Sequence, residues 1–161
     1  ALLLDLFSCL LAGSAPNAIP ASGYMAGTMR CLDRDAWHSA GEILDEVIQQ
    51  IAAPYGVDVH LEHTRGVPPV VNSEHETALI EAAARAEIGE GAVVLTPQSM
   101  GGEAFAWFLA DLPGAMMRLG TKTPGGEEYD LHRGDCILDE RALGLGIKVL
   151  TAAALRTLRD L

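Results

Sequence analysis

Apolar and polar residues alternate along the first part of this chain with the period of two that is typical of β-strands. Residues 2–11 form a short apolar run, residues 24–31 alternate, and residues 57–63 alternate again. These ranges predict three strands, each buried on at least one face. A cluster of glycine, proline and asparagine at residues 13–17 predicts a loop between the first two strands.

The period of 3.6 residues that marks amphipathic helices appears elsewhere. Asp33 or Asp35 can cap a helix that Pro54 and Gly56 end, with apolar residues on one side and acidic or amide residues on the other. Further helices are predicted at residues 75–88, 104–109 and 139–159. The last of these is apolar on two sides, which predicts that both sides are packed.

This order of elements divides the chain into two parts that have different fold classes. The first part predicts an antiparallel sheet with a helix on one face, an α+β arrangement. In the second part, short strands at residues 92–95 and 115–119 alternate with helices, which predicts the edge of an α/β sheet. The adjacent prolines 68 and 69 cannot continue a central strand. We therefore expect an α/β protein with a boundary between residues 1–72 and 73–161.

Charge and cysteine content narrow the class of partner and the compartment. The net charge of −11 argues against nucleic acid and anionic membranes as partners. No apolar run approaches the roughly 20 residues of a membrane span, and Asp5 together with the lack of a basic leader favours a buried strand over a signal peptide. Cys9, Cys31 and Cys136 form no Cys-x-x-Cys pair, which predicts buried free thiols and a cytoplasmic protein.

Few residues indicate chemistry without reference to any family. A catalytic zinc ion needs about three protein ligands, and among five histidines only His132, in a glycine-rich loop, stands out from its neighbours. Asn17 lies in the loop after the first predicted strand, and Arg30 lies late in the second. Both could therefore lie at one end of the sheet and bind a carboxylate. Alternatively, His132 is only exposed, Asn17 satisfies its own backbone, and Arg30 is hydrated.

Four stretches in a fixed order resemble the metallo-aminoacylase and carboxypeptidase family, in its branch of hippurate hydrolases and indole-acetyl-amino-acid hydrolases. The resemblance runs from about residue 10 to the C-terminus. The stretches are Gly13-Ser14-Ala15-Pro16-Asn17-Ala18-Ile19-Pro20 with Gly27-Thr28-Met29-Arg30, then Arg65-Gly66-Val67-Pro68-Pro69-Val70-Val71-Asn72, then Ser99-Met100-Gly101-Gly102-Glu103-Ala104-Phe105, and last Leu131-His132 with Asp139-Glu140.

The resemblance implies an incomplete two-domain zinc-hydrolase architecture. Residues 1–72 resemble part of a lid that mediates dimerisation, and residues 73–161 resemble the end of a catalytic domain. His132 matches a ligand of zinc or manganese, Asn17 and Arg30 match a pair that binds the substrate, and Gly101 and Gly102 match a loop lining the pocket. The family's intact enzymes cleave N-acyl amino acids or related amides with a metal-activated water and a glutamate base.

This sequence also departs from the family pattern. The remaining metal ligands and the base glutamate precede the matched region, Leu11 stands where many relatives carry histidine, and Ala104 stands where relatives carry aspartate. We therefore expect that this chain alone hydrolyses nothing. The alternative is a non-catalytic dimerising or carboxylate-binding module on the lid scaffold. An uncovered apolar sheet face and a free strand edge predict a homodimer.

Overall fold

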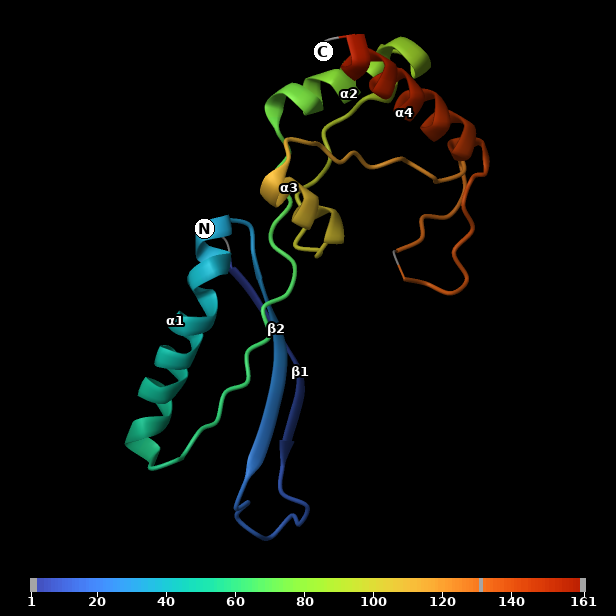
Figure 1. The fold of residues 1–161 in the computed structure, drawn as a ribbon. Helices are drawn as coiled ribbons and strands as arrows, with labels where there is room; N and C mark the ends of the chain where they lie inside the picture. The colour runs from blue at the N-terminus through green and yellow to red at the C-terminus, as the bar shows by residue number, and fades with distance from the viewer. Residues whose placement is uncertain (1–2, 131, 160–161) are drawn as a thin grey trace. The chain divides into compact units, whose positions relative to one another are not determined.

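The computed structural model describes residues 3–130 and 132–159, and the chain divides into two compact units. Unit 1 contains Ala1–Val70 and Ser99–Ala110, and unit 2 contains Val71–Gln98 and Asp111–Leu161. Residues 99–110 thus pack in unit 1, although they follow the boundary expected at residue 72. The assignment of residues 1–72 and 73–161 to two domains stays a prediction. The mixture of helices with a small sheet agrees with the expected fold class (Figure 1).

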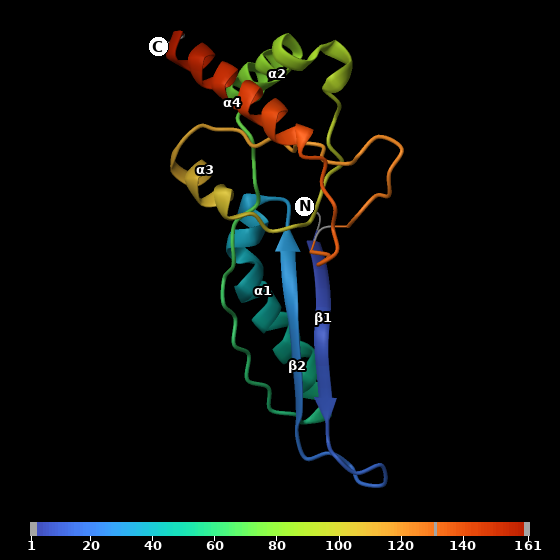
Figure 2. The same cartoon turned by 90° about the vertical axis from the view of Figure 1, so that its right-hand side faces the viewer.

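An antiparallel hairpin is the sheet of unit 1. β1 (Leu3–Ala12) and β2 (Gly23–Cys31) pair from Leu3 opposite Cys31 to Ala12 opposite Gly23. A register shift between Phe7 and Cys9 leaves one extra residue in β1, which is a β-bulge. Both strands confirm the alternation in the sequence, and Figure 2 shows them side by side along their full length.

Helix α1 (Arg34–Ala52) lies beside this hairpin (Figures 1 and 2). The Asp33 carboxylate accepts a hydrogen bond from the Ala36 backbone N–H at 2.8 Å, so Asp33, of the two predicted candidates, is the cap. Ala40 of α1 and Cys31 of β2 are buried. The helix gives way to η1 (Ala53–Tyr55), a 3₁₀ turn that ends at Gly56 with φ +64°. Glycine adopts this left-handed conformation at little cost, which explains the stop.

The predicted strand at residues 57–63 is extended but is not part of a sheet. In the described residues, no backbone ladder joins this segment to β1 or β2. It lies along α1 instead, where Gln49 Nε2 donates to the Val59 carbonyl at 3.2 Å and Arg65 donates to the His38 carbonyl at 2.8 Å. The alternation correctly indicated an extended backbone, but a strand also needs a neighbouring edge, which this part of the structure does not provide.

Residues 99–110 return to unit 1 after an excursion through unit 2. Their predicted helix is confirmed as η3 (Ala104–Trp107) followed by α3 (Phe108–Asp111). Ala106 and Leu109 are buried, and Arg34 Nη2 donates to the Leu109 carbonyl at 3.3 Å. A short helical segment is marginal by itself, so these contacts with unit 1 hold it in place.

Unit 2 consists mainly of α2 (Glu74–Ile88) and α4 (Arg141–Arg159), which pack against each other (Figure 2). Their contact is built from small residues and one valine, so the helices approach closely. The buried members are Ala83, Ala84, Ala142, Gly146, Val149 and Ala153. A short turn, η2 (Glu90–Ala92), follows α2. None of the helices in the described ranges is both long and apolar enough to cross a bilayer.

The strands predicted at residues 92–95 and 115–119 are wrong, because neither range belongs to a ladder in the described structure. The Asn72 side chain takes the place of a strand partner for Met116. Its Nδ2 donates to the Met116 carbonyl and its Oδ1 accepts from the Met116 N–H, both at 2.9 Å. A side-chain amide can copy one rung of a ladder, but it does not continue along the backbone.

The prediction that α4 is packed on both sides is also wrong within the described residues. One side contacts α2, whereas the opposite side is exposed. Its exposed apolar residues are Leu143, Ile147, Leu150 and Leu158. An apolar stripe at helical spacing indicates a face suited to burial, but burial needs a second element at that place.

We expect Gly41→Ala to be less favourable than a glycine-to-alanine change elsewhere in a helix. A Cβ on Gly41 would lie 2.3 Å from Nδ1 of His63, whereas a Cβ on Gly144 of α4 meets nothing within 4 Å. Alanine raises helix stability by about 1 kcal/mol over glycine, so Gly144→Ala should stabilise unit 2, and Gly41→Ala should lose this gain to the displaced imidazole. The free energy of unfolding in urea measures both. Equal stabilisation by the two variants, or no recovery in Gly41→Ala with His63→Ala, would contradict this packing.

Candidate functional site

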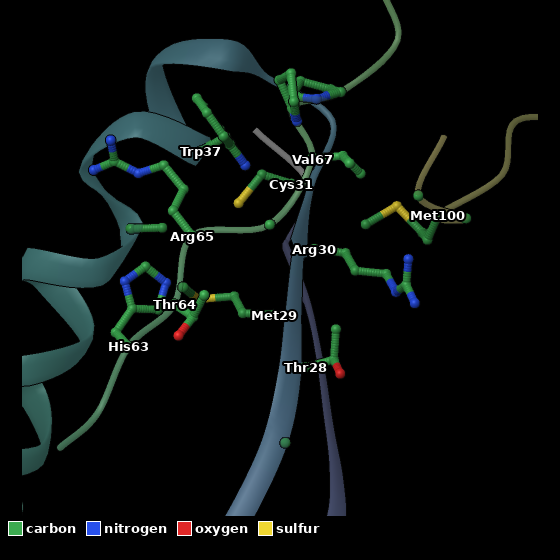
Figure 3. Close-up of a pocket in the computed structure, with 17 residues that line it drawn as sticks. Thr28, Met29, Arg30, Cys31, Trp37, His63, Thr64, Arg65, Val67 and Met100 are labelled. Carbon is green, nitrogen blue, oxygen red and sulfur yellow. The ribbon is translucent and has the colours of Figure 1, made fainter. Parts of the chain in front are cut away.

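A cavity of about 280 Å³ lies within unit 1. It is bounded by the end of β2, the start of α1, the extended segment 63–69 and the loop at residues 100–102 (Figure 3). Three of these four walls belong to stretches that the sequence analysis singled out, although those stretches are far apart along the chain.

Strand alternation sends neighbouring side chains of β2 to opposite sides. In Figure 3, Arg30 extends toward Met100, while Met29 and Cys31 extend toward α1. Arg30 is half-buried, and it has no ion pair or side-chain hydrogen bond with residues 8–130 and 132–159, whose side chains the structure describes. Its five N–H donors are therefore available to a ligand.

The electrostatic character of the cavity is opposite to that of the whole chain. The chain carries a net charge of −11, yet no described residue lining the cavity is an aspartate or glutamate. Among the described residues that line the cavity, the side chains that can carry a positive charge are Arg30, Arg65 and His63. Arg65 is already engaged, because its guanidinium lies over Trp37 and donates to the His38 carbonyl. Arg30 is thus the group best placed to bind an anion such as a carboxylate.

Gly102 permits a close approach of the loop to Arg30. A Cβ at this position would lie 3.2 Å from Arg30 Nη1 and 3.0 Å from Val67 Cγ2. Any side chain at residue 102 would therefore press on the guanidinium or on the valine. Gly101 beside it donates its backbone N–H to Ser99 Oγ at 3.0 Å. The structure brings Arg30, Gly101 and Gly102 together in one cavity. The sequence analysis predicted that all three bind the substrate, and that role requires them to lie close together.

The helix-facing side of the cavity contains a thiol. Burial, and secondarily the charge of Asp33, raises the pKa of Cys31 above its usual value of 9.0. A raised pKa keeps the thiol protonated and unreactive near neutral pH. The expectation of free cysteines agrees with the structure, in which all three are unpaired. Only Cys31 is buried; Cys9 is half-buried and Cys136 is exposed, so the expected burial is wrong for these two.

Asn17 does not join this cavity within one chain. It lies in the exposed loop between β1 and β2, beyond the pair formed by Ala12 and Gly23. Arg30 pairs with Leu4 at the other end of the hairpin. The expectation that both side chains point to one end of the sheet is therefore wrong. A hairpin loop and the far end of its second strand are separated by the length of the strands, about 3.4 Å per residue.

His132 lies in unit 2, in the loop that leads to α4. It is exposed, with φ +72°, and this left-handed value is uncommon for a residue with a side chain. Next to it, Arg133 pairs with Asp135 at 2.6 Å and lies over the Tyr129 ring at 5.2 Å. The Arg133 hydrogen bonds lower the pKa of Asp135. These contacts order the neighbours of the histidine and leave its imidazole accessible.

The base of this loop is also fixed. The Asp139 backbone N–H donates to the Thr121 carbonyl at 2.8 Å. The Asp139 carboxylate accepts from the Arg141 backbone N–H at 3.0 Å, where α4 begins. Hydrogen bonds from the Arg141 side chain and backbone lower the pKa of Asp139 to about 2. The carboxylate therefore keeps its charge at the positive end of the helix at all but strongly acidic pH.

A complete metal centre is not formed by the described residues. No group of three or more His, Cys, Asp or Glu side chains in residues 8–130 and 132–159 could hold an ion. One imidazole falls short of the roughly three ligands of a catalytic zinc. The residues present therefore do not fit the metal by themselves, and His132 can supply at most one donor to it.

Sequence reasoning gave no role to Val67 or Met100, which also line the cavity. Both lie within stretches that carry the family resemblance, Arg65–Asn72 and Ser99–Phe105. Their place in those stretches was the sequence signal that could have identified them as residues of the site. Hydrophobic periodicity could not reveal them, because each lies in an extended loop segment.

Comparisons with known proteins extend over most of the chain. The family model described as "Peptidase family M20/M25/M40" matches residues 8–156. A putative glutamate--cysteine ligase 2-3 of Rhodococcus jostii is 40% identical, over 88% of this chain and 18% of that protein. Probable hydrolase sll0100 of Synechocystis is 35% identical, over 88% of this chain and 37% of that protein. An N-acetylcysteine deacetylase of Bacillus subtilis is 36% identical, over 82% and 33%.

A solved structure matches the fold. The YXEP protein of Bacillus subtilis, described as a dinuclear metal binding peptidase from the M20 family, superposes with a TM-score of 0.84 and 28% sequence identity. The match covers 99% of this chain and 43% of that protein. This chain therefore spans less than half the length of the relatives that it matches.

Proposed function

Because the chain belongs to the peptidase family M20/M25/M40, we propose that it is part of a metal-dependent amidohydrolase that acts on N-acyl amino acids. Its own contribution is a binding site for the substrate carboxylate, centred on Arg30. The observation that carries this proposal is the free guanidinium of Arg30 against Gly102, in a cavity where no described lining residue is acidic.

The chemistry of the cavity supports this class of substrate. A free amino acid carboxylate would accept two N–H donors from Arg30 in a bidentate pair. Val67 and Met100 lie beside the arginine and offer an apolar surface (Figure 3), which suits the acyl group or side chain of such a substrate. Within the family, the ordered motifs support the branch of hippurate hydrolases and indole-acetyl-amino-acid hydrolases. A relative named N-acetylcysteine deacetylase also supports an N-acyl amino acid.

The finer roles of the two parts belong to the same proposal. Residues 1–72 act as part of a lid, and residues 73–161 act as part of a catalytic domain in a cytoplasmic enzyme. His132 would be one ligand of a zinc or manganese ion, and such an ion would supply polarisation of the scissile carbonyl. Asn17 binds substrate only where another chain brings it to a cavity, because its own hairpin holds it away from Arg30.

Binding of N-acetyl-L-leucine to the purified chain tests the role of Arg30. We expect Arg30→Ala to weaken binding about tenfold, since a charged hydrogen bond contributes about 1.5 kcal/mol. Arg30→Lys should recover part of the loss, because lysine keeps the charge but not the bidentate geometry. Arg118→Ala, which removes an exposed arginine of unit 2, is the matched control. Titration calorimetry measures each affinity.

N-acetyl-L-leucinamide lacks the carboxylate and is the matched ligand. Its binding should be weak and should not depend on Arg30. If the acid and the amide bind equally well, or if Arg30→Ala binds the acid as the parent chain does, then the cavity is not a carboxylate site.

Zinc content after loading and gel filtration tests the role of His132. We expect much less than one ion per chain and no turnover of N-acetyl-L-leucine, because the described residues supply one imidazole where about three ligands are needed. His60→Ala is the control, since that imidazole is also exposed. About one tightly held ion per chain, lost in His132→Ala and kept in His60→Ala, would reveal a complete metal centre and overturn this expectation.

Light scattering over a tenfold dilution tests self-association. We propose a homodimer formed through the hairpin, because apolar side chains remain exposed on both of its faces. These are Leu10 opposite Met25 and Leu11 opposite Tyr24. The parent chain should show twice the chain mass, and Leu10→Lys should shift it toward the monomer. Leu95→Lys, at a residue of unit 2 that is 97% exposed, should leave the mass unchanged. A monomeric mass at every concentration would exclude the dimer.

A further inference from the structure

Residues 99–110 pack in unit 1, although the chain on both sides of them packs in unit 2. We propose that Trp107 is a positioning residue, which holds the Gly101–Gly102 loop against Arg30 by packing on Trp37. This inference rests on the proposed function, since the loop and Arg30 form the carboxylate site. Trp107 itself is absent from the residues that line the cavity.

The loop has few contacts that could place it without help. Its hydrogen bonds in the described structure are local: the Gly101 N–H donates to Ser99 Oγ, and the Phe105 N–H donates to the Glu103 carboxylate. Such bonds shape a loop, but they do not attach it to another element. Its approach to Arg30 at Gly102 must therefore depend on the residues that follow it.

Trp107 provides an aromatic contact just after the loop. Its ring packs edge to face on Trp37 of α1, with centroids 5.9 Å apart and planes at 76°. This is a favoured geometry for two aromatic rings. The Leu109 carbonyl accepts a hydrogen bond from Arg34, also of α1, in the next turn. Two contacts to one helix thus fix the direction in which the segment leaves the loop.

Trp37 also contacts Arg65. The guanidinium of Arg65 lies 5.3 Å from the Trp37 ring centroid and donates to the His38 carbonyl. Two residues after Arg65, Val67 contacts the position of Gly102. The chain of contacts from Val67 through Arg65 and Trp37 to Trp107 therefore begins at Gly102 and ends five residues after it.

The exposed fraction of the Trp107 side chain indicates that it positions the loop and is not part of the core of unit 1. Trp107 is 50% exposed, and the buried residues of its segment are Ala106 and Leu109. Loss of the indole should therefore release the loop before it destabilises unit 1. The neighbouring Phe108 is 65% exposed and packs on Phe105, with centroids 6.0 Å apart, so it offers a matched aromatic control.

The two tryptophans are the only ones in the chain, so circular dichroism can report their contact directly. Two indoles in contact give an exciton couplet, and Trp107→Phe or Trp107→Leu should abolish it. Amide hydrogen exchange at Gly101, whose N–H is hydrogen-bonded to Ser99 Oγ, should rise at least threefold in Trp107→Leu. It should stay near the parent rate in Trp107→Phe, which keeps an aromatic edge, and in Phe108→Ala.

Affinity for N-acetyl-L-leucine should fall in the variant whose exchange rises. We expect a loss of about fivefold in Trp107→Leu and an affinity near that of the parent chain in Trp107→Phe. Exchange and dichroism need no ligand, so failure of the parent chain to bind this probe would overturn the carboxylate site alone. Unchanged exchange at Gly101 in Trp107→Leu, in a chain that melts like the parent, would overturn the positioning role. Equal loss in Phe108→Ala would also overturn it.

Discussion

The register of the β1–β2 hairpin is the constraint on which the candidate site depends. Because side chains alternate along a strand, the pairing of Arg30 with Leu4 decides which face of β2 carries the guanidinium. With this register, Arg30 extends toward Met100 while Met29 and Cys31 extend toward α1 (Figure 3). A slip by one residue would place an arginine against the helix and a methionine at the anion site. The β-bulge between Phe7 and Cys9 is part of the same register.

Unit 1 stabilises this arrangement with few buried residues. Its sheet has two strands, and a hairpin of this size is marginal in water without further packing. Helix α1 and the extended segment 57–69 supply that packing through hydrogen bonds, the stacked Arg65 and the contact of His63 with Gly41. Several large apolar side chains of the hairpin and of α1 nevertheless remain exposed, such as Leu10, Met25 and Ile51. Such a surface is suited to association, which is the basis of the proposed dimer.

The described residues contain more of the proposed substrate-binding site than of the proposed metal site. Three of the residues proposed for substrate binding meet in one cavity, whereas the described residues contain one isolated imidazole of the proposed metal site. Family membership rests on a match over residues 8–156, and the relatives are more than twice as long as the matched stretch. The structure therefore supports a binding role for Arg30 more directly than a catalytic role for His132.

The sequence by itself determined most of the local conformations and suggested the residues whose roles are proposed here. Alternation predicted β1 and β2, and helical spacing with caps predicted α1, α2 and α4, because these signals depend on neighbours within a few residues. Motif order identified Arg30, Gly101, Gly102 and His132. Tertiary structure decided what no local pattern contains. Residues 57–63 are extended but have no sheet edge to pair with, Met116 meets the side chain of Asn72, and residues 99–110 pack on α1 through Trp37 and Trp107. Asn17 and Arg30 were separated for the same reason, since hydrogen-bonded register, not spacing along the chain, fixes the distance between the two ends of a hairpin.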